Sequence, residues 1–215
     1  MNTNKIAEEG YKKFSKAEGC DYIAGEFALK TILHLIDTFN VKQVLELGLG
    51  IGSISDTVFN YTKKYNKEIA YTGTEANEFC LGQLPLNLGA NYQNLNLLKD
   101  ASQLESESKY DLIIVDGSDD SLERIKNHVK QHSILYIEGY RIKQVNALRN
   151  LFPKSKYVEI ISSYKPPAYG VEPSDKWSGG GQLIFINPNT KQNIFWIKNK
   201  IRTSLIYKVV RKLKK

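Results

Sequence analysis

The chain has 215 residues, of which 41% are hydrophobic and 25% are charged, with 15 Gly and 6 Pro. This composition is typical of one globular domain and excludes a collagen-like or low-complexity chain. The two cysteines, Cys20 and Cys80, lie in no metal-ligand or redox motif, so we expect reduced thiols. No run of about 20 apolar residues is present, and Glu8 and Glu9 stand where a signal peptide has its apolar core. We therefore expect a cytoplasmic protein that spans no membrane.

The formal net charge is +7, but the basic residues are concentrated at one end of the sequence. Residues 191–215 hold nine Lys or Arg and no acid, whereas the rest of the chain holds 21 basic and 23 acidic residues. A basic total often indicates nucleic-acid binding, yet here the larger part is slightly acidic and carries no recognition motif. We therefore expect no nucleic-acid partner, and we divide the chain into a main domain at residues 1–190 and a C-terminal segment at 191–215.

Helical and strand patterns alternate along most of the main domain. A helical apolar spacing over 23–39 is followed by a short β-branched strand over 41–47. The later predicted helices are 53–65, 77–88, 121–130 and 142–152, and the later predicted strands are 68–74, 95–98, 110–115, 133–137, 157–163 and 182–187. This alternation predicts an α/β fold, a Rossmann-like, doubly wound and mostly parallel seven-stranded sheet with helices on both faces. The long connection 165–181 is either a lid or a surface loop.

The C-terminal segment predicts a basic amphipathic helix, because apolar residues recur every three or four positions. These residues are Ile194, Ile197, Ile201, Leu205, Val209 and Leu213. Such a helix can lie peripherally on an anionic membrane, pack against the main domain or form a homodimer contact. Lys208 and Lys212 fall within the apolar side, so the sequence leaves these three alternatives open.

A glycine-rich turn follows the strand at 41–47 and reads Glu46-Leu47-Gly48-Leu49-Gly50-Ile51-Gly52-Ser53. Glycines permit positive φ and lack Cβ atoms, so a ligand can approach the backbone amides at the start of the next helix. Ligands of open α/β sheets bind beyond the carboxyl ends of the strands where the strand order reverses, and we place that point here. The next strand is followed by Glu75, an acid well placed to accept the ribose hydroxyls of a nucleoside.

Two residues of the turn distinguish between classes of nucleoside ligand. A dinucleotide fingerprint needs a third glycine where Ser53 stands, and a carboxylate at Glu46 would repel a pyrophosphate. The same carboxylate suits a ligand that carries an ammonium and a sulfonium group, which is S-adenosylmethionine. The sequence therefore disfavours an NAD-dependent oxidoreductase.

At this turn the chain resembles the class I S-adenosylmethionine-dependent methyltransferases, whose first motif is an acid-x-Gly-x-Gly-x-Gly run after a strand. The resemblance covers about residues 25–188. It implies that the glycines line the methionine part of the cofactor, that the acid after the second strand holds the ribose, and that the segment after the third strand contacts adenine. The cofactor-binding residues expected on this basis are Glu46, Gly48, Gly50, Gly52, Ser53, Glu75, Asp100 and Ala101.

The end of the strand at 110–115 is similar to that of small-molecule O-methyltransferases of the catechol and macrocin types. It continues as Asp116-Gly117-Ser118-Asp119-Asp120, and the next strand ends at Glu138. The resemblance implies Asp116 and Glu138 as ligands of Mg²⁺, which would orient an acceptor hydroxyl and lower its pKa. Asp116 and Asp119 are the expected catalytic residues.

The reaction expected from this resemblance is transfer of a methyl group from S-adenosylmethionine to a hydroxyl oxygen of a small molecule, such as a sugar or a lipid-linked saccharide. Asp119 stands where the relatives have a histidine as general base. That difference leaves a second hypothesis open, a non-catalytic module that binds a nucleoside and associates with a membrane or a protein.

Overall fold

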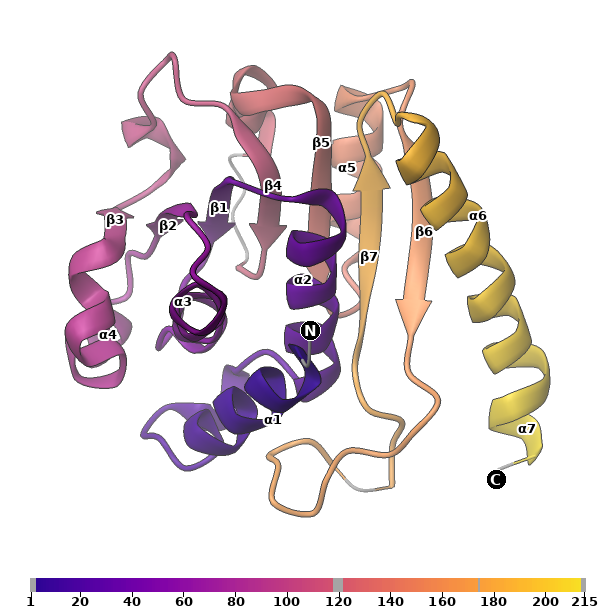
Figure 1. Ribbon diagram of the computed structural model, residues 1–215, viewed down its shortest axis with the longest axis horizontal. Coiled ribbons are helices and arrows are strands. Elements are labelled where there is room, and N and C mark those ends of the chain that lie inside the picture. Colours follow the sequence, from indigo (N-terminus) through magenta and orange to yellow (C-terminus); the bar gives the residue numbers. More distant parts are fainter. Residues whose placement is uncertain (1–2, 118–121, 174, 214–215) are drawn as a thin grey trace.

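A computed structural model describes the protein over residues 3–117, 122–173 and 175–213. Within these ranges seven strands form one sheet in the order β3-β2-β1-β4-β5-β7-β6 (Figure 1). Six of these strands point the same way, and β7 runs antiparallel to β5 and β6. The strands are β1 Gln43–Leu47, β2 Ala70–Thr74, β3 Leu95–Leu98, β4 Tyr110–Val115, β5 Val129–Glu138, β6 Lys156–Ile161 and β7 Gly180–Phe185. The predicted mostly parallel sheet of seven strands is confirmed.

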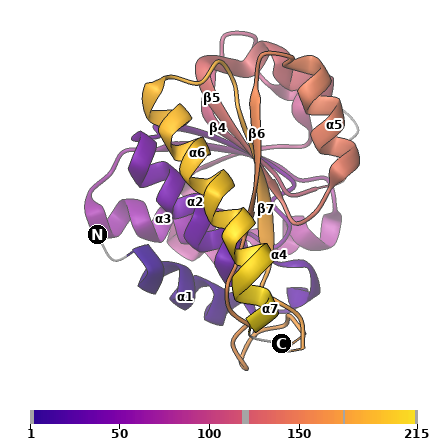
Figure 2. The ribbon, with the colours of Figure 1, turned by 90° about the vertical axis from the view of Figure 1, so that its right-hand side faces the viewer.

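Helices cover both faces of the sheet, as Figure 2 shows with α2, α3 and α6 on one side and α5 on the other. The face under α2 carries the larger apolar cluster, which also includes residues of α1 and α4. The opposite face buries Val145 and Leu148 of α5. The helices are α1 Thr3–Phe14, α2 Glu26–Phe39, α3 Ser53–Tyr65, α4 Glu78–Leu88, α5 Ile142–Leu151, α6 Thr190–Leu205 and α7 Arg211–Leu213, and the shorter turns are η1 Cys20–Tyr22, η2 Gly89–Asn94, η3 Ala101–Gln103, η4 Leu122–His128 and η5 Ile206–Val210.

The strand order reverses at β1. β2 pairs with β1 on one side and β4 pairs with it on the other, both in parallel register. The chain therefore leaves the carboxyl ends of β1 and β4 in opposite directions, which opens a crevice between their loops. This is the point where the sequence places the ligand.

One predicted helix is wrong. The segment 121–130 was expected to be α-helical, but its described part forms the 3₁₀ turn η4, and β5 already begins at Val129. The buried residues of η4 are Leu122, Ile125 and His128, a spacing of three that matches the period of a 3₁₀ helix. The apolar pattern in this segment therefore reflects a period of 3.0 residues and not of 3.6.

The C-terminal segment is helical and lies along β6. A capping box formed by Asn189 and Gln192 begins α6. The indole Nε1 of Trp196 donates to the Tyr157 carbonyl at 2.7 Å, and Thr203 Oγ1 donates to the Glu159 carbonyl at 2.7 Å. Among the described residues no helix combines the length and the apolar character needed to cross a bilayer.

The connection between β6 and β7 folds back onto the start of α2. The Glu172 carboxylate accepts hydrogen bonds from the Gly179 amide at 2.9 Å and from Ser178 Oγ at 3.1 Å. The Tyr169 hydroxyl donates to Glu26 of α2 at 2.6 Å. The Glu172 bonds therefore hold the connection to itself, and the Tyr169 bond attaches it to α2.

Candidate functional site

A cavity of about 800 Å³ opens at the carboxyl ends of β1, β2 and β4. It is lined by the glycine turn and by the residues that follow β2, β3 and β4. The expected site residues that line it are Gly48, Gly50, Ser53, Glu75, Asp100 and Asp116. A second hollow of about 850 Å³ lies at the amino ends of β1 and β2, around Gln43 and Ala70. Because ligands of open α/β sheets bind at the carboxyl edge, we assign the site to the first cavity.

Two glycines of the turn are needed for different reasons. Gly48 has φ +88°, and a Cβ atom there would lie 2.8 Å from the backbone of Gly117, so this glycine lets the loops after β1 and β4 approach each other. Gly50 has φ +52°, and a Cβ atom there would meet nothing within 4 Å. The backbone at Gly50 is therefore open toward the cavity and available to a ligand.

The Glu75 carboxylate is fixed at the rim of the cavity by backbone amides. Its Oε2 accepts from the Gly50 amide at 2.7 Å, and its Oε1 accepts from the amides of Ala76 at 2.9 Å and Asn77 at 2.8 Å. These bonds join the end of β2 to the glycine turn and orient the acid before any ligand binds. An acid held in this way can accept hydrogen bonds from the hydroxyls of a ribose.

Glu46 lies inside the core and does not line the cavity. Its side chain is fully buried, and its Oε2 accepts from the Tyr71 hydroxyl at 2.5 Å. Its Oε1 is without a hydrogen-bond partner among the described residues. Burial raises the pKa of Glu46 well above its usual value, and the charges of Asp116 and Glu75 add to this. A cation bound nearby would stabilise the ionised form of this acid.

The other expected cofactor residues lie beside the cavity or at its edge. Gly52 is the N-cap of α3, and Ala101 is buried in the cluster on the α5 face, so neither lines the cavity. Asp100 does line it, and its Oδ1 accepts from the Ser102 amide at 2.6 Å. This bond holds the turn after β3 in place, and hydrogen bonding to the side chain and the amide of Ser102 lowers the pKa of Asp100.

Asp116 and Glu138 form a partly buried acidic pair at the ends of β4 and β5. Asp116 lines the cavity, whereas Glu138 does not. Burial raises the pKa of Asp116 well above its usual value, and the neighbouring charge of Glu138 raises it further. Burial also raises the pKa of Glu138, to about 7. Both carboxyl groups therefore hold protons more tightly than carboxyl groups in water do.

Arg141 is a site residue that the sequence did not indicate. Its guanidinium donates to three backbone carbonyls, those of Glu138 at 3.0 Å, Gly117 at 3.1 Å and Asp116 at 3.0 Å. Its Nη2 also lies 3.6 Å from the Asp116 carboxylate. Arg141 therefore joins the ends of β4 and β5 and supplies a positive charge to the acidic pair. No spacing rule connects a residue just before α5 to these two strand ends.

The two expected magnesium ligands, Asp116 and Glu138, lie at the ends of neighbouring strands, with Arg141 beside them. In residues 3–117, 122–173 and 175–213, no group of three or more His, Cys, Asp or Glu side chains could hold a metal ion. The cation that faces Asp116 is the Arg141 guanidinium. Asp119, the second expected catalytic residue, lies outside the described residues.

The outer wall of the cavity comes from segments that the sequence analysis did not single out as functional. Asp21 and Tyr22 of η1 line it together with Phe79 and Cys80 of α4. The Tyr22 side chain is 94% exposed, so its aromatic ring can contact a ligand. Only the fold brings this N-terminal segment to the strand ends, and no motif marks it.

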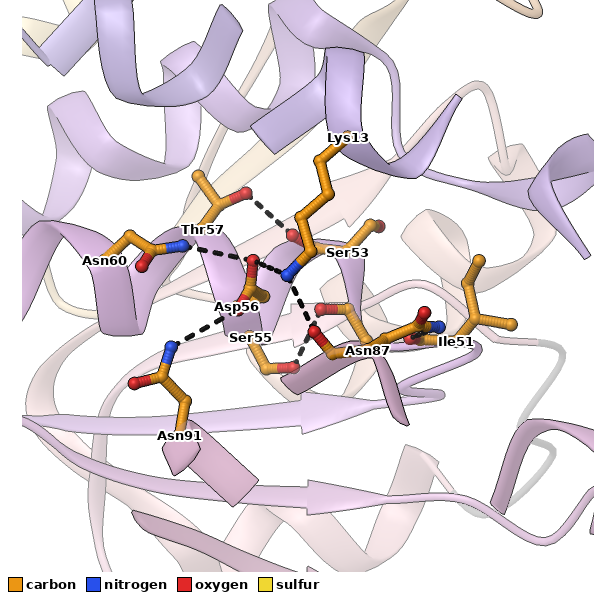
Figure 3. A network of polar contacts seen from close by, with 10 residues as sticks. Lys13, Ile51, Ser53, Ser55, Asp56, Thr57, Asn60, Asn87 and Asn91 are labelled. Atoms are coloured by element: carbon orange, nitrogen blue, oxygen red, sulfur yellow. Dashed lines mark hydrogen bonds and ion pairs between the residues drawn. The ribbon is translucent and has the colours of Figure 1, made fainter. Parts of the chain in front are cut away.

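A polar network supports the glycine turn from behind (Figure 3). Its centre is Asp56, a buried residue in the first half of α3. The carboxylate of Asp56 accepts from Lys13 Nζ at 2.8 Å, Asn60 Nδ2 at 3.0 Å and Asn91 Nδ2 at 3.3 Å. Lys13 also donates to the Asn87 carbonyl at 2.6 Å, and Asn87 Nδ2 donates to the Ile51 carbonyl at 3.0 Å. α1 and α4 are thereby connected to the turn that lines the cavity.

Solved structures of methyltransferases share this fold. An O-methyltransferase from Bacillus cereus in complex with SAH has a TM-score of 0.63 at 12% identity, over 85% of this chain and 90% of that one. The O-methyltransferase of tomaymycin synthesis from Streptomyces achromogenes, in complex with SAM, has a TM-score of 0.57 at 10% identity, over 86% and 90%. A precorrin-6y C5,15-methyltransferase from Geobacter metallireducens has a TM-score of 0.55 at 14% identity, over 78% and 91%. The chain therefore has the Rossmann-like fold of these methyltransferases.

The sequence itself is distant from known families. No protein-family model matches it, and no curated protein does. The chemistry must therefore be argued from the site and not from the fold.

Proposed function

We propose that this protein binds S-adenosylmethionine in the cavity at the end of β1 and transfers its methyl group to a hydroxyl oxygen of a small molecule. The observation that carries the proposal is the meeting of three features at one cavity. These are the open backbone of Gly50, the oriented carboxylate of Glu75 and the partly buried carboxyl group of Asp116.

Each part of the cofactor has a matching residue. Glu75 would accept the ribose hydroxyls, Gly48 and Gly50 would lie along the methionine part, and Asp100 would lie near the adenine. The buried, half-paired carboxyl group of Glu46 favours a cationic ligand over a pyrophosphate. When bound, S-adenosylmethionine supplies an electrophilic methyl group on a positively charged sulfur.

Asp116 is the group proposed to accept the acceptor's proton. A general base works best when its pKa lies near the working pH, and burial moves the pKa of Asp116 in that direction. As the acceptor oxygen bonds to the methyl carbon and the carbon–sulfur bond breaks, the hydroxyl proton passes to the Asp116 carboxylate. Arg141 keeps the loop after β4 in position through the carbonyls of Asp116 and Gly117. This route uses no metal ion.

The acceptor class is a small molecule with a hydroxyl group, and sugars and lipid-linked saccharides are the first candidates. The exposed ring of Tyr22 and the side chain of Asp21 provide the aromatic and acidic wall that a polyhydroxylated acceptor can contact. The proposed proton transfer to Asp116 needs no metal ion, so we expect methyl transfer to continue after magnesium is chelated.

Calorimetric titration of the protein with S-adenosylhomocysteine tests the cofactor. We expect micromolar binding, no binding of NAD, and at least a tenfold loss of affinity in Glu75→Gln, which keeps the size of the side chain but loses its charge. Glu78→Gln, at an exposed acid three residues later, is the matched control. Failure to bind S-adenosylhomocysteine, or binding of NAD instead, would refute the proposal.

A screen of hydroxyl acceptors, with and without a chelator, tests the reaction. Asp116→Asn should abolish methyl transfer while S-adenosylhomocysteine binding persists, since the amide cannot accept the proton. If the protein binds S-adenosylhomocysteine but methylates no acceptor, the result would support the alternative of a non-catalytic nucleoside-binding module.

A further inference from the structure

The C-terminal helical segment, residues 190–213, exposes apolar side chains on the side that faces away from the main domain. α6 packs on β6 through Trp196 and Thr203, which point toward the sheet. About half of each apolar side chain on the outward side is exposed, with values of 50% for Ile194, 48% for Ile197, 57% for Ile201 and 56% for Leu205. These four residues follow one another at intervals of one helical turn, so they form a single stripe.

The stripe continues past the end of α6. Val209 is 47% exposed and Leu213 is 81% exposed, and each follows the preceding stripe residue by four positions. Packing on the sheet does not explain these side chains, because the residues that contact the main domain lie on the other side of the helix. A contiguous apolar stripe that the fold leaves open indicates an interaction surface.

Basic residues lie along the whole segment, and two of them, Lys208 and Lys212, fall within the apolar side. Residues 191–215 contain nine Lys or Arg and no acid. Lys198 and Arg202 also line a groove of about 670 Å³ between α6 and α2, whose other walls include Phe27 and Phe195. The surface around the stripe is therefore both positively charged and apolar.

We infer that this outward side of residues 190–213 docks on an anionic lipid surface. An apolar stripe bordered by Lys and Arg enters the boundary between headgroups and acyl chains, while its cations meet the lipid phosphates. A second copy of the chain fits less well, because a two-fold contact through the stripe would bring two segments with seven cations each against one another. The charge of the segment thus favours a lipid over a dimer partner.

The docked orientation follows from the fold. α6 runs along β6, and α7 lies at the end of the molecule toward which β4 and β6 point (Figure 1). The candidate cavity opens at the carboxyl ends of the parallel strands, which is the same end. A membrane that holds the segment therefore lies beside β6, and α7 lies toward the end of the molecule that carries the site.

Cosedimentation of the full chain with lipid vesicles tests the inference without any assay of methyl transfer. The vesicles contain phosphatidylcholine alone or with one third phosphatidylglycerol. We expect at least tenfold stronger binding to the anionic vesicles at about 0.1 M salt and a clear loss at about 0.5 M salt. Equal binding to both vesicles, or no binding to either, overturns the inference.

Two matched pairs of variants separate the stripe from its charges. Ile201→Glu should weaken binding at least tenfold, whereas Leu86→Glu, at a residue of α4 that is 75% exposed, should not. Lys208→Gln combined with Lys212→Gln should weaken binding to anionic vesicles, whereas Lys63→Gln combined with Lys64→Gln, at the end of α3, should leave it unchanged. Circular dichroism checks that each variant is folded.

Analytical ultracentrifugation of the protein without vesicles tests whether a second copy of the chain covers the stripe instead. If the chain is a dimer that Ile201→Glu converts to a monomer, and the variant still binds anionic vesicles as the parent does, the stripe is a dimer contact and the inference is wrong. A monomer whose vesicle binding is lost in Ile201→Glu supports it.

Discussion

At the residue scale, surroundings and not residue type decide what the acids of this site can do. Glu75 is held by three backbone amides, whereas Glu46 has a bond from Tyr71 on one oxygen only. The sequence could identify both acids from their positions relative to the glycine turn. It could not predict that Glu46 lies in the core, or that Arg141 lies beside Asp116, because these facts depend on packing between distant segments.

Glu138 allows a test of the acidic pair through stability. Burial raises the pKa of Glu138 from 4.5 to about 7, so between these values the folded protein holds a proton that the unfolded chain has released. Stability therefore falls as the pH rises through this window. We expect thermal melts between about pH 5 and pH 8 to show a steeper fall for the parent than for Glu138→Gln, which cannot ionise.

The control for this experiment is Glu107→Gln, at an exposed acid before β4. Its melting temperature should follow the pH dependence of the parent. If the curve of Glu138→Gln also follows the parent, the carboxyl group of Glu138 does not have a raised pKa, and its proposed influence on Asp116 is lost.

At the element scale, the parts that the sequence could predict are those with a strong period. Every predicted strand is present, since each one is a short run rich in apolar residues. α1 is harder to detect, because two of the five residues it buries are Ala7 and Gly10, which add little to an apolar pattern. Yet α1 supplies Lys13, so this helix helps to hold the turn that lines the cavity.

Lys13 tests the attachment of α1. Asp56 is buried, and removing its only described cation leaves a buried carboxylate with two amide partners. We expect Lys13→Met to lower the free energy of unfolding by roughly 2 kcal/mol in urea titrations, because a buried charge loses a charged partner. Lys16→Met, at an exposed lysine three residues later, should change the free energy of unfolding by less than about 0.5 kcal/mol.

A double-mutant cycle identifies the partner. In an Asp56→Asn background the effect of Lys13→Met should shrink, because the charge it compensates is gone. Equal effects of Lys13→Met in both backgrounds would show that the lysine acts elsewhere, for example only through the Asn87 carbonyl.

At the scale of the whole molecule, the charge of the sequence changes near residue 190, but the hydrophobic core does not end there. The C-terminal segment differs in composition from the rest, which is why the sequence predicts it as a unit of its own. In the structure Phe195 contacts Phe39 of α2 and Phe185 of β7, with ring centroids 5.2 and 5.9 Å apart. Composition cannot reveal such a contact, because it depends on where the chain returns after β7.

Phe195 therefore tests whether the C-terminal helix and the main domain unfold together. We expect Phe195→Ala to lower the stability of the whole protein by roughly 3 kcal/mol, since it removes a ring from an aromatic cluster. For a chain of this length that loss corresponds to a fall in melting temperature of about 6 to 12 °C. Ile197→Ala, two residues later on the exposed side, should change the melting temperature little.

The helical circular dichroism signal and the tyrosine fluorescence of the parent should decline in one transition. Two transitions, with helix lost first, would instead mean that residues 191–215 form an independent unit, and the lipid-docking segment would then be able to leave β6.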